Sequence, residues 1–176
     1  MGLCAVKTSF VRWRPEMKYV QIECDKEELW TELGGDDHAI RQIIMELDED
    51  DYAVRQMIVD ENNEYHYSCL EDCLAEGQVH EDEMDEKMID LPSQVFETMW
   101  DTVLKQYEKQ WRKQIDKYPV GAHIQGILVY NYPQGAIIKG EDFIAVYKGD
   151  APFIPHKEVC YQVLSYDHCN MWLVVG

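Results

Sequence analysis

The residues with the clearest potential to bind a ligand are aromatic and basic side chains near the C-terminus. They are Tyr130, Tyr132, Tyr147, Lys139 and Lys148. Tyrosine rings stack on unpaired bases and lysines neutralise phosphates, so this set is typical of a surface that binds single-stranded RNA. Ordinary tyrosines on the surface of a β-barrel, beside solvated lysines, are the alternative. We therefore treat these five side chains as a candidate RNA-binding face.

The sequence shows no pattern of a known catalytic site. It lacks a phosphate-binding loop, a dinucleotide fingerprint, a nucleophile elbow and a His-Glu-x-x-His motif. No spacing sets a histidine beside a cysteine or serine nucleophile, because the six histidines are scattered: His38, His66, His80, His123, His156 and His168. Although residues distant in sequence can meet in a fold, we expect a non-catalytic protein that uses no cofactor.

The six cysteines lack the paired short spacings of a zinc ribbon, and no Cys-x-x-Cys occurs. Cys69 and Cys73 are separated by three residues, whereas Cys160 and Cys169 flank an expected strand and turn. Whether these four side chains meet in space is left open. We expect reduced, structural cysteines, as is usual in the cytosol, and no metal site.

The last third of the chain, from Pro119 to Gly176, predicts a small β-barrel. Short β-rich segments alternate with turn residues, such as the proline and glycine at 133 and 135. About five strands at this spacing are typical of a barrel, which removes exposed edges by closure. The expected strands lie at 121–130, 136–138, 143–147, 160–165 and 171–175.

This segment resembles the ribosomal S-one-type RNA-binding domain. The resemblance rests on Gly121 and on the sequences GILV at 126–129, GAII at 135–138 and VLSYDHCNMWL at 163–173. It implies an OB-fold barrel that binds single-stranded RNA or a ribosome-associated target. Where that family carries aromatic residues and a histidine on its RNA-binding face, this chain has Gln134, Ile137 and roughly Val146. The resemblance thereby adds Gln134 to the candidate ligand-binding residues.

Composition indicates a globular protein of one large or two small domains. The chain has 176 residues, of which 46% are hydrophobic and 28% charged. No apolar run approaches the roughly 18 residues of a membrane span. The first residues lack the apolar core of a secretory signal. We expect a cytoplasmic protein with no membrane partner.

The net charge of −18 is concentrated in the first half of the chain. Residues 1–90 hold 8 basic and 25 acidic side chains, whereas residues 91–176 hold 8 and 9. A negative field repels phosphates and attracts basic proteins. The alternative function is therefore an acidic mimic of nucleic acid, of the antitoxin or immunity type, that holds a basic protein partner. Acidity that serves only solubility remains open.

We predict an α+β fold with four parts: an acidic α+β domain at 1–80, an acidic connector at 81–92, an amphipathic helix at 93–117 and the OB-like barrel at 118–176. Apolar residues repeat every three or four positions from Val95 to Ile115, and lysines and arginine gather at the end of this helix. That basic cluster could hold phosphate or the acidic domain of the same chain.

In the acidic domain we expect strands at 4–13 and 18–24, followed by a short helix that Asp25 caps and that Gly34 and Gly35 end. A second helix should begin at Asp36 or Asp37, because Ile40, Ile43, Ile44 and Leu47 have helical spacing. Strands at 52–59 and 64–68 should then form a hairpin, with helix as the alternative at 53–59.

Overall fold

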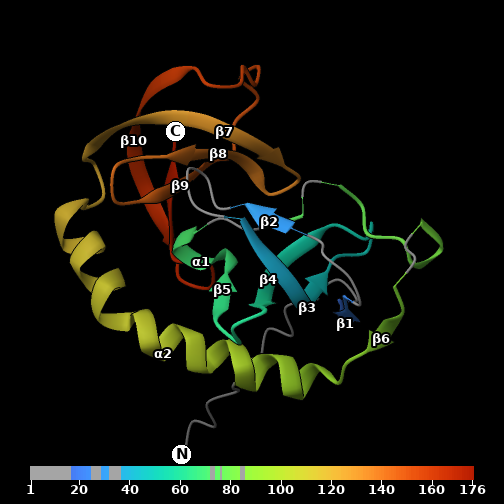
Figure 1. Ribbon diagram of the computed structural model, residues 1–176. Coiled ribbons are helices and arrows are strands. Elements are labelled where there is room, and N and C mark those ends of the chain that lie inside the picture. The colour runs from blue at the N-terminus through green and yellow to red at the C-terminus, as the bar shows by residue number, and fades with distance from the viewer. Residues whose placement is uncertain (1–16, 25–28, 32–36, 72–73, 76, 84–85) are drawn as a thin grey trace, which may run out of the picture.

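The computed structural model describes residues 17–24, 29–31, 37–71, 74–75, 77–83 and 86–176. The protein belongs to the α+β class, as predicted (Figure 1). An N-terminal sheet lies between a long helix and a C-terminal barrel (Figure 1). The strand expected at 4–13 falls outside the described residues.

The N-terminal sheet is built from antiparallel strands in the order β5-β4-β3-β1-β6, with β2 paired to β3. Its strands are β1 (Lys18–Glu23), β2 (Leu29–Thr31), β3 (Asp37–Leu47), β4 (Ala53–Asp60), β5 (Tyr65–Tyr67) and β6 (Met88–Asp90). The β4–β5 hairpin matches the prediction. A short helix, α1 (Ser68–Glu71), follows it.

The two helices predicted before residue 48 are wrong. Residues 29–31 form β2, and the second segment forms β3, the longest strand of the sheet. Both faces of β3 are covered: Ile44 packs on the side of the long helix, whereas Met45 and Leu47 pack on the side of the barrel. A strand buried on both faces carries apolar residues without alternation, and this run imitated helical spacing.

The acidic segment at 81–92 is more than a connector. It contains a single 3-10 turn, Glu81–Glu83, and then β6, which pairs with β1. This pairing makes the segment part of the N-terminal sheet.

The long helix α2 spans Ser93–Lys117, the range that the sequence predicted. It runs beneath the N-terminal sheet and then bends up toward the barrel (Figure 1). Its buried side chains are Phe96, Trp100, Val103, Trp111 and Gln114. At its end, Lys117 and Tyr118 bind the Asp142 carboxylate at 2.7 and 2.6 Å. These hydrogen bonds lower the pKa of Asp142 and fix the helix to the β8–β9 loop.

A buried ionic cluster fixes α2 to the sheet. Arg55 of β4 binds Glu46 of β3 at 2.5 Å and Glu97 of α2 at 2.6 and 3.1 Å. The guanidinium also lies over the rings of Phe96 and Trp100. Burial alone would lower the pKa of Arg55, but the hydrogen bonds and charges of both carboxylates outweigh it and raise that pKa.

The C-terminal barrel consists of β7 (His123–Tyr132), β8 (Gly135–Lys139), β9 (Ile144–Tyr147), β10 (Glu158–Asp167) and β11 (Trp172–Val175). These are the five strands expected from the sequence, with small shifts at their ends. They close in the order β7-β8-β9-β11-β10, and β10 pairs back to β7. Only the β9–β11 pair is parallel.

The outer face of β8, β9 and β11 packs against the N-terminal sheet. Ile138 and Ala145 point into the barrel, whereas their neighbours Ile137 and Val146 point outward and are still fully buried. The contact joins Val20, Ile22, Met45, Leu47 and Ala53 of the sheet to Tyr132, Ile137, Ile144, Val146 and Trp172 of the barrel. The two halves therefore share one apolar interface.

We expect Arg55→Met to lower the free energy of unfolding by about 3–5 kcal/mol, because Glu46 would keep a buried charge without its partner. Urea denaturation measures this change. Arg112→Met is the matched control, since Arg112 pairs with Glu108 on the exposed surface of α2. It should cost at most about 0.5 kcal/mol. Equal effects of the two substitutions would contradict the role given to the buried cluster.

Candidate functional site

The candidate ligand-binding residues on β7 and its turn contact the N-terminal half of the chain. The Tyr132 hydroxyl is buried and donates to the Leu74 carbonyl at 3.1 Å. The Gln134 amide donates to the Ala53 carbonyl at 2.9 Å. Tyr130 stacks on Tyr132 and packs against the same interface. The polar groups of Tyr132 and Gln134 therefore hold the chain's own backbone.

The other candidate residues lie elsewhere on the barrel. Tyr147 stacks on Tyr161, with ring centroids 4.5 Å apart, and both rings pack against the cluster that includes the barrel interior. Lys148 is exposed beyond β9, whereas Lys139, at the opposite end of β8, lines a cavity on the outer surface. The structure does not bring the six candidate residues together on one face.

The turn between β10 and β11 is held by α2. The Trp100 indole donates to the Cys169 carbonyl at 2.9 Å, and the Trp111 indole donates to Nδ1 of His168 at 3.1 Å. Both tryptophans belong to the apolar repeat of the helix, and no pattern in the sequence pointed to these polar contacts. These two hydrogen bonds attach the β10–β11 turn of the barrel to α2.

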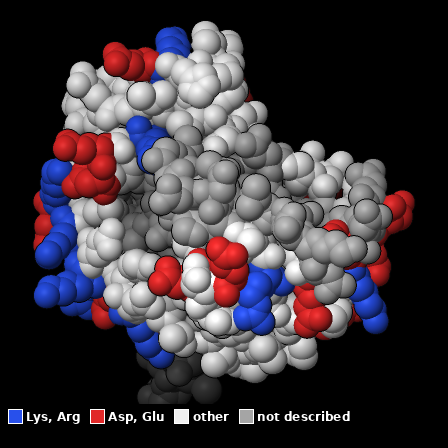
Figure 2. Space-filling model, in the orientation of Figure 1, with Lys and Arg blue, Asp and Glu red and all other residues white. Residues whose placement is uncertain are grey.

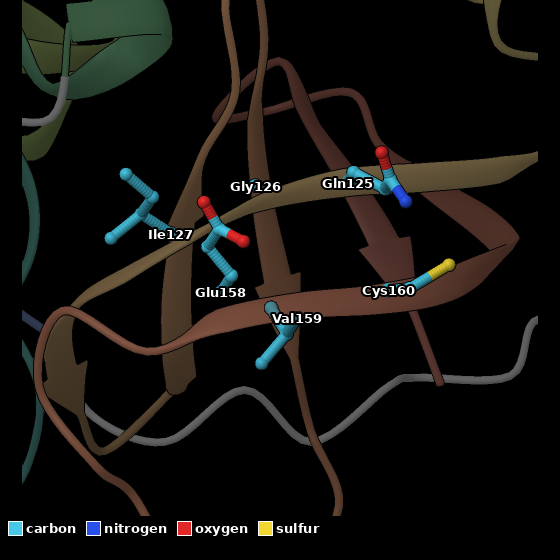
Figure 3. Close-up of a pocket in the computed structure, with 6 residues that line it drawn as sticks. All are labelled: Gln125, Gly126, Ile127, Glu158, Val159 and Cys160. Carbon is cyan, nitrogen blue, oxygen red and sulfur yellow. The ribbon is translucent and has the colours of Figure 1, made fainter.

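A cavity of about 400 Å³ lies on the open side of the barrel, between β7 and β10. Gln125 and Ile127 of β7 project there beside Glu158 and Cys160 of β10 (Figure 3). A neighbouring cavity shares the β7 residues and reaches Lys139, Glu141 and His156. Two carboxylates thus oppose one lysine and one histidine. The groove lacks the excess of positive charge that binding of a nucleic-acid backbone requires.

The acidic residues of the N-terminal half form an ordered surface where two loops meet. The Asp48 carboxylate accepts the backbone N–H groups of Asp50 and Tyr52, each at 3.0 Å. The second loop joins through Val79, whose N–H donates to the Asp51 carbonyl, and through Gln78, whose amide donates to the Asp50 carbonyl. The exposed carboxylates of this acidic surface are Glu49, Asp50, Glu81 and Asp82.

Four basic residues of α2 face away from the surfaces that the helix packs against. Lys105, Lys109, Arg112 and Lys113 are exposed and lie opposite its buried stripe. Lysine and arginine side chains gather along the edge of the molecule where α2 rises to the barrel (Figure 2). Among the described residues, the only ion pair in this basic ridge joins Arg112 to Glu108 of the same helix. Within the described residues, no side chain of the acidic N-terminal half forms an ion pair with the ridge.

The cysteines do not form a metal site within the described part of the chain. Cys69 is buried near β5, whereas Cys160 and Cys169 are exposed on β10 and on the β10–β11 turn. No group of three or more histidine, cysteine or acidic side chains suited to a metal gathers among the residues that the structure describes.

Comparisons with protein-family models, with curated proteins and with solved structures found no match to this chain. Among the described helices, none is long and apolar enough to cross a membrane. The proposals about function therefore rest on the shapes and charges of the described surfaces.

We expect Tyr132→Phe to lower the free energy of unfolding by about 0.5–1.5 kcal/mol, because the Leu74 carbonyl would lose its donor at a buried position. Thermal and urea denaturation measure the change. Tyr65→Phe is the control, since that ring is 46% exposed, and it should stay within about 0.5 kcal/mol of the parent. An unchanged stability of Tyr132→Phe would show that its hydroxyl does not help to hold the interface.

Proposed function

We propose that this chain is a non-catalytic cytoplasmic binding protein whose acidic surface holds a basic protein partner. The observation that carries the proposal is the order of that surface: hydrogen bonds fix the 48–51 loop against residues 78–79. A loop backbone that is already ordered loses little freedom on binding. Their field, within a half of the chain that carries 25 acidic and 8 basic side chains, attracts a basic partner.

We propose further that the barrel is an OB-fold that serves as a platform. Five strands in a closed order, with a single parallel pair, support this assignment. OB-folds bind oligonucleotides on the face of their second and third strands and on the adjoining loops. Here the equivalents are β8 and β9, the β7–β8 turn and the β10–β11 turn. Each of these contacts the N-terminal sheet or α2, which argues against RNA at the usual place.

A second candidate function is binding of single-stranded RNA or of a ribosome-associated target at a surface other than the usual OB-fold face. The specific observation in its favour is the basic ridge of α2, which stands beside the barrel and has no acidic partner from another element among the described residues. Phosphates bound there would be positioned by charge alone, so affinity would fall steeply with salt. The large negative charge of the chain opposes this function.

The decisive test is a pull-down from cells under native conditions with matched charge reversals. We expect one basic protein to bind the parent, to be released at about 1 M salt, where charges are screened within about 3 Å, and to be lost when Glu49, Asp50, Glu81 and Asp82 become lysine. Reversal of Asp101, Asp116, Glu141 and Asp150, which are exposed elsewhere, adds the same charge and should retain the partner. Retention by both variants, or no partner at all, would refute the proposal.

Fluorescence anisotropy with labelled single-stranded RNA separates the two candidates. The first predicts no binding at physiological salt. Binding that disappears when Lys105, Lys109, Arg112 and Lys113 become glutamate would support the second candidate instead.

A further inference from the structure

A row of four paired residues crosses the N-terminal sheet. Glu23 of β1 pairs with Gln42 of β3, Gln42 pairs with Val59 of β4, and Val59 pairs with Tyr65 of β5. Directly paired residues of antiparallel strands project to the same face, and neighbouring strands lie about 4.8 Å apart, so the row is about 14 Å long. Along the row lie, in order, the Glu23 carboxylate, an amide, the apolar side chain of Val59 and the Tyr65 phenol.

These four side chains line a cavity of about 470 Å³, together with Arg41 and Asn63. This volume lies within the usual range of about 300–1,000 Å³ for small-molecule sites. We call it the Arg41 cleft. It is separate from the acidic surface and from the cavities of the barrel, whose linings share none of these residues.

A β-bulge brings Arg41 to the cleft. Successive residues of a strand normally point to opposite faces, yet Arg41 and Gln42 both line this cavity. The pairing of β3 with β4 shifts between Ile40 and Gln42, which makes Arg41 the extra residue. Bulges re-aim side chains in this way, often beside functional sites. The Arg41 guanidinium then donates to the Asn63 side-chain oxygen.

The turn that carries Asn63 is fixed from beneath. The fully buried Asp60 carboxylate accepts the backbone N–H groups of Asn62 and Glu64, both at 2.8 Å, and lies 3.4 Å from Nε2 of His66. Burial alone would raise the pKa of Asp60, but these hydrogen bonds outweigh it and lower that pKa. The wall of the cleft is therefore preorganised.

Arg41 keeps its charge available for a ligand. In the described part of the sheet, Lys18 pairs with Asp51 and Arg55 with Glu46 and Glu97, whereas Arg41 binds a neutral amide. A guanidinium has five N–H donors and binds carboxylates bidentately. At the other side of the row, the Glu23 carboxylate accepts the Gln21 amide at 3.3 Å and no other side chain among the described residues. Glu23 and Arg41 thus bring opposite charges to one cavity from the neighbouring strands β1 and β3.

We propose that the Arg41 cleft binds a free α-amino acid with an aromatic or apolar side chain. Arg41 holds its carboxylate, Glu23 holds its ammonium group, and its side chain lies over Val59 against the ring of Tyr65. The surrounding negative charge repels simple anions. A zwitterion has no net charge and escapes that repulsion, which favours it over a plain carboxylate or phosphate.

Titration of the full chain with L-phenylalanine, followed by amide NMR shifts, tests the proposal. We expect saturable millimolar binding, with shifts at the end of β1, in the middle of β3 and at the β4–β5 turn. Two analogues each lack one charge: 3-phenylpropionate has no ammonium group and 2-phenylethylamine has no carboxylate. Each should bind at least about tenfold more weakly, because a hydrogen bond to a charged group contributes about 1.5–3 kcal/mol.

Two variants place the ligand in the cleft. Arg41→Gln and Glu23→Gln should each weaken L-phenylalanine at least about tenfold, whereas Lys87→Gln and Glu81→Gln, at exposed positions of the same half that do not line the cleft, should leave it unchanged. If Arg41→Gln does not fold, Arg41→Lys keeps the charge without the planar fork and should still bind more weakly. No saturable shift at millimolar L-phenylalanine, equal binding of the analogues, or equal binding by the Arg41 variant would overturn the proposal.

Discussion

The burial of the outer face of β8, β9 and β11 against the N-terminal sheet determines what every other surface of this protein can do. Fully burying an isoleucine or valine side chain stabilises a fold by about 1.5–3 kcal/mol, and Ile137 and Val146 are both completely buried there. The resemblance noted in the sequence would place Ile137, and roughly Val146, where the S-one-type family carries groups that face RNA. Aliphatic side chains at these two positions suit permanent packing against another apolar layer, and they offer no ring on which a base could stack.

The helix α2 makes this arrangement a single unit. It is fixed to the sheet by Arg55 and Glu97, to the β10–β11 turn by Trp100 and Trp111, and to the β8–β9 loop by Lys117. Binding functions are left to the surfaces outside these contacts. We propose the acidic surface for a basic protein and the Arg41 cleft for a small zwitterion. These two surfaces consist of different residues, so each proposal can be tested without the other.

Local signals made much of the fold predictable. The apolar repeat of α2 fixed its bounds, and turn residues separated the five barrel strands. The strand β3 was mistaken for a helix because both of its faces are buried, a fact that only the tertiary structure contains. The roles of Tyr132 and Gln134 were also out of reach, since their partners, Leu74 and Ala53, are backbone carbonyls far away in sequence. The Arg41 cleft depends on the β-bulge that turns Arg41 toward it, and no residue pattern in the sequence predicts this bulge.

Native-state hydrogen exchange of the full chain tests most directly whether the sheet permanently covers the barrel. If it does, the slowest amides of β3 and of β8 exchange with the same free energy of opening, because neither half can open while the other stays folded. Amides of β3 that open at a much lower free energy, while those of β8 and β9 stay protected, would contradict the account. They would mean that the sheet leaves the barrel and exposes the face on which an OB-fold binds RNA.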